Sequence, residues 1–296
     1  MKFAAIDIGT NAVRLLLTNV IEGGGSPLFK KEALVRMPIR LGADAFGSGR
    51  ISDEKVDRLV ESMIGFKHLI KAYPALDYMA MATSAMRVAE NGPEVASIVD
   101  ERAGILIDII DGRTEAEVIY ANHIEDRLDP DNNYFYVDVG GGSTEISIIV
   151  DREVIASASF RIGTVRTLRG STKVSEWQKM KDWLTSKTSQ HRPITGIGSG
   201  GNINKIFKLA HIIPGSPITY KRIRKMHKFL SSFSLDERIL NLKLRPDRAD
   251  VIIPASEIYL SVMKWAGAKS MFVPQFGLSD GMVHVLYDRY RTNTPV

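Results

Sequence analysis

The sequence of 296 residues contains no cysteine. This absence excludes disulfides, thiolate zinc sites, cysteine-held iron–sulfur clusters and a cysteine nucleophile. No stretch approaches the roughly 18 apolar residues that a membrane-spanning helix needs. Asp7 also interrupts the apolar N-terminal run before it reaches the length of a signal peptide. We therefore expect a cytoplasmic protein with no membrane partner.

The motifs of several enzyme classes are also missing. The six histidines show no H-E-x-x-H spacing, which argues against a zincin-type metal site. No G-x-S-x-G elbow is present, so a serine acyl-transfer enzyme of that type is excluded. The glycine-rich turns lack both the lysine of a P-loop and the full G-x-G-x-x-G pattern, which excludes these two nucleotide folds.

What is present is the composition of a folded protein, with 44% hydrophobic and 25% charged residues. At about 150 residues per domain, the length predicts two domains. The formal net charge of +5 suits a polyanionic partner, although an ordinary basic surface explains it equally well. We expect no specific nucleic-acid partner.

Strand and helix patterns alternate along the first half of the chain. Apolar runs separated by glycine-containing turns predict strands at 3–8, 13–20 and 28–37. Helical spacing follows Ser52, and further segments predict strands at 78–82 and 105–110 and helices at 92–103 and 114–124. This alternation predicts an α/β fold with helices layered on sheets.

The opening pattern returns in the second half. Strands are predicted at 134–139, 146–150 and 154–160, and Asp138 stands before a glycine turn as Asp7 does. Further segments predict strands at 193–197 and 270–273 and helices at 175–186, 220–231, 246–266 and 279–287. We infer an internal duplication with domains at 1–123 and 124–296, the last helix being free to pack back on the first domain.

Three glycine-rich turns follow predicted strands that end near residues 8, 139 and 197. Such turns expose consecutive backbone N–H groups, which bind phosphate oxygens well, although each alone could be an ordinary tight hairpin. The candidate phosphate-binding residues are Gly9, Thr10, Asn11, Arg14, Ser84, Gly140, Gly141, Gly142, Ser143, Thr144, Gly200 and Gly201.

Carboxylates stand beside two of these turns. Asp7, Asp138 and Glu145 lie on strands that are otherwise apolar. A buried carboxylate is costly unless it is paired or binds a cation, and carboxylates are ligands for Mg²⁺ beside phosphates. We expect these three residues to hold Mg²⁺, with Mn²⁺ as an alternative; the competing interpretation is that they cap their own turns.

The segment Gly112–Glu117 offers a candidate general base at a strand-to-helix junction. Glu115 and Glu117 both have the chemistry to deprotonate an attacking water, and both could equally be ordinary charges at a helix N-terminus. Arg87 follows another turn, and its planar guanidinium suits the grip of a phosphate.

Several strings, in this order, resemble the Ppx/GppA phosphatases of the actin-like ATPase superfamily: DIGTNAVRLLL, ATSAMR, GRTEAE, DVGGGSTE, GSGGN and RADVIIPASEIYLSVMKWAG with FGLSDGM. The resemblance extends over essentially the whole chain. It implies two ribonuclease-H-like domains (the ASKHA fold) with mixed sheets flanked by helices around a cleft.

The resemblance also implies an activity: removal of the terminal phosphate of linear polyphosphate or of guanosine pentaphosphate (pppGpp). By motif, Glu115 stands at the family's catalytic-base position, whereas Glu117 falls at a variable one. Asp7, Asp138 and Glu145 match positions associated with the metal, and the two glycine loops with Arg87 match phosphate-binding elements. A homodimer is a further expectation from the family.

The chain departs from the family pattern near its end. Ser279-Asp280-Gly281 replaces a frequent Arg-Glu-Gly, and no His-Asp dipeptide of the longer members occurs. The chain thus resembles the short, two-domain class. The departure keeps a second hypothesis open, a polyphosphate or alarmone sensor with little turnover. A third is an acetate- or sugar-type kinase of the same fold.

Overall fold

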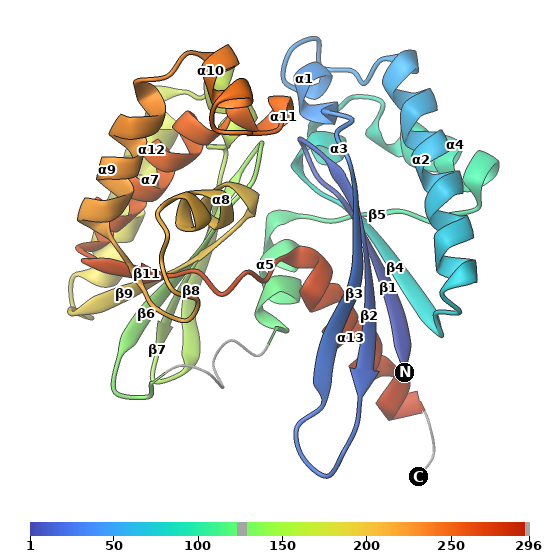
Figure 1. Cartoon of the computed structure of the whole chain (residues 1–296), viewed down its shortest axis with the longest axis horizontal. Helices are drawn as coiled ribbons and strands as arrows, with labels where there is room; N and C mark the ends of the chain where they lie inside the picture. Colours follow the sequence, from blue (N-terminus) through green and yellow to red (C-terminus); the bar gives the residue numbers. More distant parts are fainter. Residues whose placement is uncertain (123–128, 294–296) are drawn as a thin grey trace. The chain divides into compact units, whose positions relative to one another are not determined.

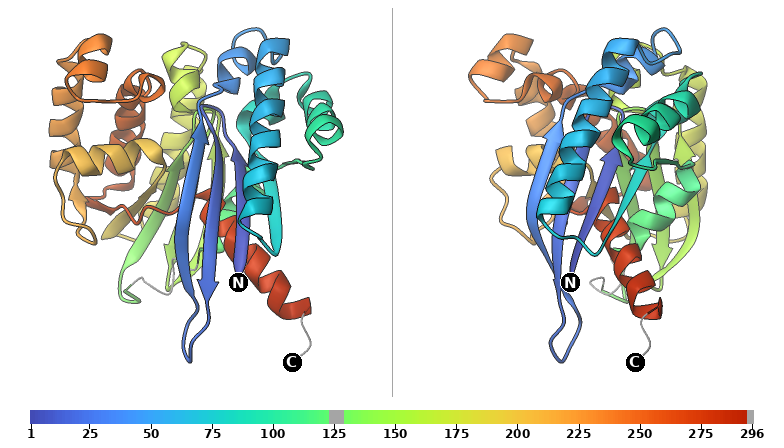
Figure 2. Two further views of the ribbon diagram at one scale, coloured as in Figure 1. Left: turned by 45° about the vertical axis from the view of Figure 1, so that its right-hand side comes forward. Right: turned by 90° about the vertical axis from the view of Figure 1, so that its right-hand side faces the viewer.

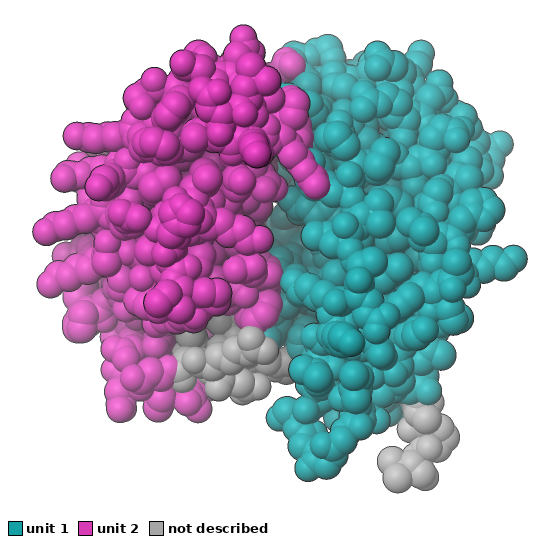
Figure 3. Space-filling view, viewed as in Figure 1, with its two compact units in different colours: residues 1–122, 277–296 teal, residues 123–276 magenta. Residues whose placement is uncertain are grey.

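The structure, a computed structural model, describes residues 1–122 and 129–293. The chain forms two compact units, shown in different colours in Figure 3. Unit 1 contains Met1–Asn122 and Gly277–Val296, and unit 2 contains His123–Phe276. The C-terminal helix, which the sequence left free to pack on the first domain, lies in unit 1. The predicted boundary at 123/124 and the predicted helix end at 124 fall outside the described residues.

Unit 1 is built on a five-stranded mixed sheet in the order β3-β2-β1-β4-β5 (Figure 1). Neighbouring strands β1, β2 and β3 are antiparallel, and β4 and β5 continue the sheet in parallel. The strands are β1 (Lys2–Ile8), β2 (Val13–Ile21), β3 (Leu28–Met37), β4 (Asp77–Ala82) and β5 (Asp108–Ile109).

Helices cover both faces of this sheet. They are α1 (Leu41–Ala45), α2 (Asp53–Ala72), α3 (Ser84–Val88), α4 (Gly92–Ala103), α5 (Gly112–Tyr120) and α13 (Leu278–Asn293). Ile6 and Ile8 join the core formed with α2 and α4, whereas Phe3 packs on Tyr287 of α13. Figure 2 shows α2 and α13 on opposite sides of the strands. Since side chains alternate along a strand, Asp7 shares the α13 face with Phe3.

Unit 2 is built on a six-stranded sheet in the order β10-β11-β9-β6-β7-β8. The three strands β6, β7 and β8 are antiparallel, and β9 pairs in parallel with β6. The strands are β6 (Asn133–Val139), β7 (Thr144–Val150), β8 (Glu153–Phe160), β9 (Ile194–Ser199), β10 (Ile218–Thr219) and β11 (Ser270–Phe272).

The main core of unit 2 lies on one face of its sheet. The helices of the unit are α6 (Thr164–Leu168), α7 (Val174–Thr188), α8 (Gly201–Leu209), α9 (Tyr220–Ser231), α10 (Leu235–Leu240), α11 (Pro246–Ala249) and α12 (Ile252–Ala266). Val137 and Val139 pack with α12 and its neighbours in this core. Asp138, between them in sequence, therefore points to the opposite face.

The two units share one topology, as the repeated sequence pattern predicts. In each sheet the first three strands form an antiparallel meander, and the fourth, β4 or β9, returns parallel to the first. A helix of five residues follows the third strand in both, α1 in unit 1 and α6 in unit 2. The predicted α/β class with two mixed sheets is confirmed.

The structure differs from the sequence expectation at the helix predicted over 246–266. It consists of two helices, α11 and α12, interrupted at Asp250 and Val251. Pro254 explains the break, because proline has no N–H for the carbonyl four residues earlier and its ring crowds that carbonyl. The strand predicted over 105–110 is also shorter, since only Asp108 and Ile109 pair with β4. None of the described helices is long and apolar enough to cross a membrane.

Candidate functional site

The first hairpin of unit 1 pairs a buried carboxylate with an arginine. Asp7 on β1 lies directly opposite Arg14 on β2 in the strand register. Arg14 Nη1 donates to Oδ2 of Asp7 over 2.6 Å, and Asp7 is only 5% exposed. The negative charge of Asp7 is thus matched by an arginine of its own hairpin.

A glycine turn joins these two strands and is braced from behind by α1. Gly9 N–H closes the turn on the carbonyl of Ala12. The carbonyls of Thr10 and Asn11 accept from the N–H groups of Gly42 (2.9 Å) and Arg40 (3.2 Å). The short helix therefore engages the carbonyl side of the turn, and not the N–H of Thr10.

Glu115 and Arg87 lie together in unit 1. Arg87 follows β4 on α3, whose first residue is the buried Ser84, and its Nη1 donates to the carbonyl of Ile110 (2.5 Å). The same Nη1 is 3.6 Å from Oε2 of Glu115, whose side chain is 12% exposed. This contact places the predicted base beside the predicted phosphate-binding arginine.

The N-terminus of α5 fixes the position of Glu115. Asp111 caps the helix by accepting the Thr114 N–H over 2.7 Å. Hydrogen bonds from Thr114 lower the pKa of Asp111, and the bond from the backbone N–H contributes most. Glu117 points elsewhere, since its exposed side chain pairs with Arg113 at 2.9 Å. The structure therefore separates two glutamates that the residues alone left equivalent.

The first hairpin of unit 2 has two facing carboxylates, whereas the first hairpin of unit 1 has a carboxylate that faces a guanidinium. Asp138 on β6 lies opposite Glu145 on β7 in the register. Oε1 of Glu145 accepts from the Ser159 hydroxyl (2.9 Å), and the Ser199 hydroxyl on β9 lies 3.2 Å from Oδ2 of Asp138. Two carboxylates and two hydroxyls share one face of the sheet.

The glycine loop between β6 and β7 is braced by α6. Gly140 N–H closes the turn on Ser143, and the carbonyls of Gly140 and Gly141 accept from the N–H groups of α6. Arg166, itself 7% exposed, donates its Nε–H to the carbonyl of Gly142 over 3.0 Å. Burial is the main cause that lowers the pKa of this guanidinium. A positive charge is thus held behind the loop.

Four loop amides remain available for a ligand. In the described part of the chain, the backbone N–H groups of Thr10, Gly141, Gly142 and Ser143 donate to no protein acceptor. Thr144, also expected to bind phosphate, is fully buried and its hydroxyl donates to the carbonyl of Ile162 (2.6 Å).

The third glycine turn joins β9 to α8. Gly200 has φ +115°, a conformation that favours glycine, and Gly201 is the first residue of α8. A helix of nine residues presents unpaired N–H groups at its start, which suits an anion. This turn lies beside Asp138: a Cβ built on Gly200 would be 3.2 Å from Oδ1 of that residue.

The expected metal ligands Asp7, Asp138 and Glu145 belong to two units. Asp138 and Glu145 are register partners in unit 2, whereas Asp7 pairs with Arg14 in unit 1. Across residues 1–122 and 129–293, no three His, Asp or Glu side chains form a group able to hold a metal ion. The paired carboxylates of unit 2 are the oxygen donors that Mg²⁺ prefers, and Mg²⁺ commonly uses one or two carboxylates with water.

The Ser279-Asp280-Gly281 departure lies in the first turn of α13. Asp280 accepts the Gly277 N–H (3.0 Å) and pairs with Lys31 at 2.6 Å. Burial raises the pKa of Asp280, and the charge of Lys31 opposes this rise. A Cβ on Gly281 would lie 1.8 Å from the carbonyl oxygen of Val118, so glycine permits α13 to pack on α5. These contacts give the segment a role in supporting the Glu115 helix.

Sequence reasoning missed several residues that shape the loops. Gly42, Gly163 and Arg166 brace the turns, and Ser199 faces Asp138. The helices α1 and α6 are too short for an apolar period to reveal them. The signal that could have found them is the glycine that follows a predicted strand in Arg40-Leu41-Gly42 and Arg161-Ile162-Gly163.

Known proteins share this architecture. The chain is 23% identical to Exopolyphosphatase 1 of Mycobacterium leprae over 96% of this chain and 88% of that protein. It is also 23% identical to the guanosine-5'-triphosphate,3'-diphosphate pyrophosphatase of Photobacterium profundum, over 98% of this chain and 60% of that protein.

Solved structures confirm the expected actin-like α/β fold. An exopolyphosphatase from Cytophaga hutchinsonii matches with a TM-score of 0.83 and 22% identity, covering 98% of both chains. The Aquifex aeolicus member of the Ppx/GppA family matches with a TM-score of 0.75 and 24% identity, over 100% of this chain and 99% of that one. The profile of the Ppx/GppA phosphatase family matches residues 22–289. The chain therefore belongs to the Ppx/GppA phosphatase family.

Proposed function

We propose that this protein hydrolyses the terminal phosphoanhydride bond of linear polyphosphate or of guanosine pentaphosphate, with Glu115 as general base. The observation that carries the proposal is the largely buried Glu115 carboxylate, held beside Arg87 at the start of α5. The names of the M. leprae and P. profundum relatives support these two substrate classes.

The reaction follows from the chemistry of these groups. Glu115 accepts a proton from water while the water oxygen forms a bond to the terminal phosphorus. The bridging P–O bond breaks, and its electron pair leaves with the shortened chain. The products are orthophosphate and a substrate shorter by one phosphate. Arg87 would offset the charge on the terminal phosphoryl oxygens.

The two hairpins differ in what each of them would bind. Asp138 and Glu145 would hold Mg²⁺, or Mn²⁺ in its place, and Asp7 would orient Arg14 toward phosphate. The free N–H groups of Thr10, Gly141, Gly142 and Ser143 would bind non-bridging oxygens. A bound Mg²⁺ supplies charge neutralisation at the phosphate oxygens.

Substitution of Glu115 by Gln tests the proposal directly. Glu115→Gln keeps the shape and removes the basic oxygen, so kcat should fall by ~10² to 10⁴-fold, as loss of a general base usually does. Glu117→Gln is the matched control, because it changes a glutamate two residues away on the exposed face. Phosphate release should be measured on long polyphosphate, short polyphosphate and guanosine pentaphosphate.

The outcomes separate the alternatives. Phosphate release by Glu115→Gln at the rate of Glu117→Gln would refute the base assignment. Tight binding of all three substrates by the unaltered protein, with no release in Mg²⁺ or Mn²⁺, would support a sensor instead. Transfer of phosphate from ATP to a small acceptor would support a kinase.

A further inference from the structure

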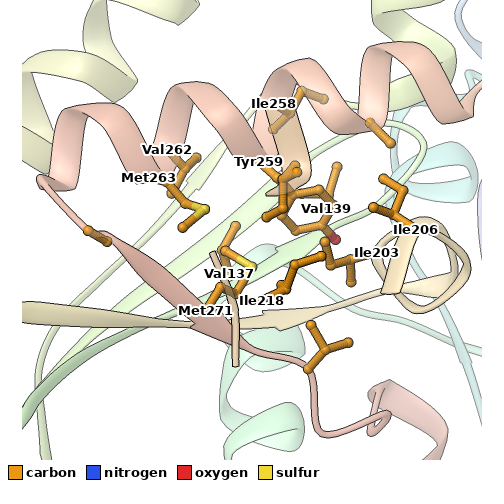
Figure 4. Close-up of a cluster of buried hydrophobic side chains, with 14 of the residues drawn as sticks. Val137, Val139, Ile203, Ile206, Ile218, Ile258, Tyr259, Val262, Met263 and Met271 are labelled. Carbon is orange, nitrogen blue, oxygen red and sulfur yellow. The ribbon is translucent and has the colours of Figure 1, made fainter. Parts of the chain in front are cut away.

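A tyrosine lies in the hydrophobic core of unit 2. Tyr259 on α12 is fully buried, and Figure 4 shows its ring among Val137, Val139, Ile203 and Ile206. A leucine or phenylalanine would fill such a site without bringing a polar atom. A buried hydroxyl is unfavourable unless it is hydrogen-bonded, so the partner of this hydroxyl is informative.

The hydroxyl of Tyr259 forms a hydrogen bond at the third glycine turn. It donates to the carbonyl oxygen of Ser199, the last residue of β9. A Cβ built on Gly200 would lie 3.0 Å from the same hydroxyl oxygen, so the ring tip lies directly against the turn. Tyr259 and Ser199 are 60 residues apart in the chain.

The same turn lies next to the Asp138 carboxylate. The Ser199 hydroxyl lies 3.2 Å from Oδ2 of Asp138 and 2.7 Å from the carbonyl oxygen of Phe276. The other carboxylate oxygen, Oδ1 of Asp138, would be 3.2 Å from a Cβ on Gly200. Burial, followed by the nearby charge of Asp138, raises the pKa of Tyr259 well above its ordinary value.

We propose that Tyr259 is a positioning residue, whose hydroxyl fixes the Ser199–Gly200 turn and thereby orients Asp138 and the start of α8. This inference rests on the proposed function, in which Asp138 holds a divalent cation and the turn faces phosphate. Tyr259 touches neither ligand. Its effect passes through the Ser199 carbonyl, which accepts the Tyr259 hydroxyl.

Tyr259→Phe isolates the hydroxyl, because phenylalanine fills the same apolar site. The dissociation constant for Mn²⁺ alone, measured by electron paramagnetic resonance without substrate, should rise by ~10-fold, as for other outer-shell partners of metal ligands. The KM for short polyphosphate should rise with it. Tyr134→Phe is the matched control, since its buried hydroxyl accepts from Asp129 N–H at the other end of β6.

The results distinguish this inference from the proposed function. Mn²⁺ affinity and KM of Tyr259→Phe equal to those of Tyr134→Phe would overturn the positioning role, even if the melting temperature fell. A wild-type protein that neither binds Mn²⁺ nor releases phosphate would overturn the proposed function together with the inference. If Tyr259→Phe does not unfold cooperatively, Ser199→Ala removes the link to Asp138, and unchanged Mn²⁺ affinity there would overturn the inference.

Discussion

The two units contain the same hairpin, but the charges that face each other across it differ. In each, an aspartate stands one residue before the end of the first strand, and its register partner is the second residue of the return strand. That partner is Arg14 for Asp7 and Glu145 for Asp138. An acid–base pair is electrically complete, whereas two facing carboxylates favour a cation between them. The two hairpins thus share a backbone and differ in charge, and in the proposed function the first faces an anion and the second a cation.

The braces behind the two glycine loops differ in the same way. Behind the first loop, Lys55 donates to the carbonyl of Arg40 and is paired with Asp44. Behind the second loop, the guanidinium of Arg166 contacts the loop carbonyl itself. The first brace is a neutral pair on α1 and α2, and the second brings positive charge to the loop backbone.

Neutralising Glu145 and Arg14, the register partners of the two aspartates, should have the largest effects. The two substitutions should change the free energy of unfolding in opposite directions. Glu145→Gln should lower kcat/KM by more than the ~10 to 100-fold that outer-shell substitutions cause. Loss of repulsion between facing carboxylates should raise stability by up to ~1 kcal/mol. Arg14→Gln should lower stability by about 1–2 kcal/mol, because Asp7 loses its partner while Arg14 is partly exposed to water.

Urea unfolding of both variants at neutral pH checks this contrast. A Glu145→Gln protein that is less stable than the unaltered chain and fully active would show that the two hairpins do not differ in the proposed way.

Alanine at the bracing glycines gives a smaller test of the same comparison. A Cβ on Gly163 would lie 2.4 Å from backbone atoms of Gly141 and Gly142, which cannot move without the loop. On Gly42 it would lie 2.1 Å from the Thr10 methyl and 3.0 Å from Cε2 of Phe46, and both are side-chain atoms. Gly163→Ala should therefore cost about 2 kcal/mol, within the usual range for overpacking. Gly42→Ala should cost below ~1 kcal/mol, since alanine also favours the helix.

Unfolding midpoints and KM for polyphosphate measure the difference between the two variants. Equal destabilisation by both substitutions would argue that the loops are not braced differently.

The smallest expected effect is a pH dependence confined to the first brace. Partial burial raises the pKa of Asp44, but hydrogen bonds from Lys55 and Ser52 outweigh it and hold the pKa below its usual 3.8. A lowered folded-state pKa stabilises the protein above the unfolded pKa, and this contribution is lost as pH falls through the folded value. Asp44→Asn should be less stable than wild type at pH 7, and the gap should narrow toward pH ~3.

Thermal unfolding of both proteins between pH 7 and pH ~3 tests whether the stability gap narrows as the pH falls. A difference in stability between wild type and Asp44→Asn that is constant with pH would show that the charge of Asp44 does not stabilise the brace. Arg166→Met, tested in parallel, should show no such narrowing, since a guanidinium remains charged at acidic pH.

Local patterns predicted much of this fold. The strands ending at Asp7 and Asp138 follow from apolar runs closed by glycine, and the helix Gly92–Ala103 and the strand Leu28–Met37 have the predicted bounds. Pattern reasoning fails where the determining contact is distant in sequence. The residues alone left Glu115 and Glu117 equivalent, and the contact of Arg87 with Glu115, 28 residues along the chain, distinguishes them.

Tyr259 illustrates the same limit most clearly. On its helix it is one more apolar residue in a buried face, and only folding brings its hydroxyl to Ser199. Likewise, the opposition of Asp138 to Glu145 depends on the register of one hairpin, and a slip of one residue would turn the two side chains to opposite faces.

Binding of Mn²⁺ to Asp7→Asn and Asp138→Asn shows directly which hairpin holds the cation. Both substitutions remove one carboxylate charge from matching positions of the two hairpins. Electron paramagnetic resonance without substrate should show Mn²⁺ affinity lost in Asp138→Asn and retained in Asp7→Asn. Equal loss in both variants would contradict the assignment of the cation to the hairpin of unit 2.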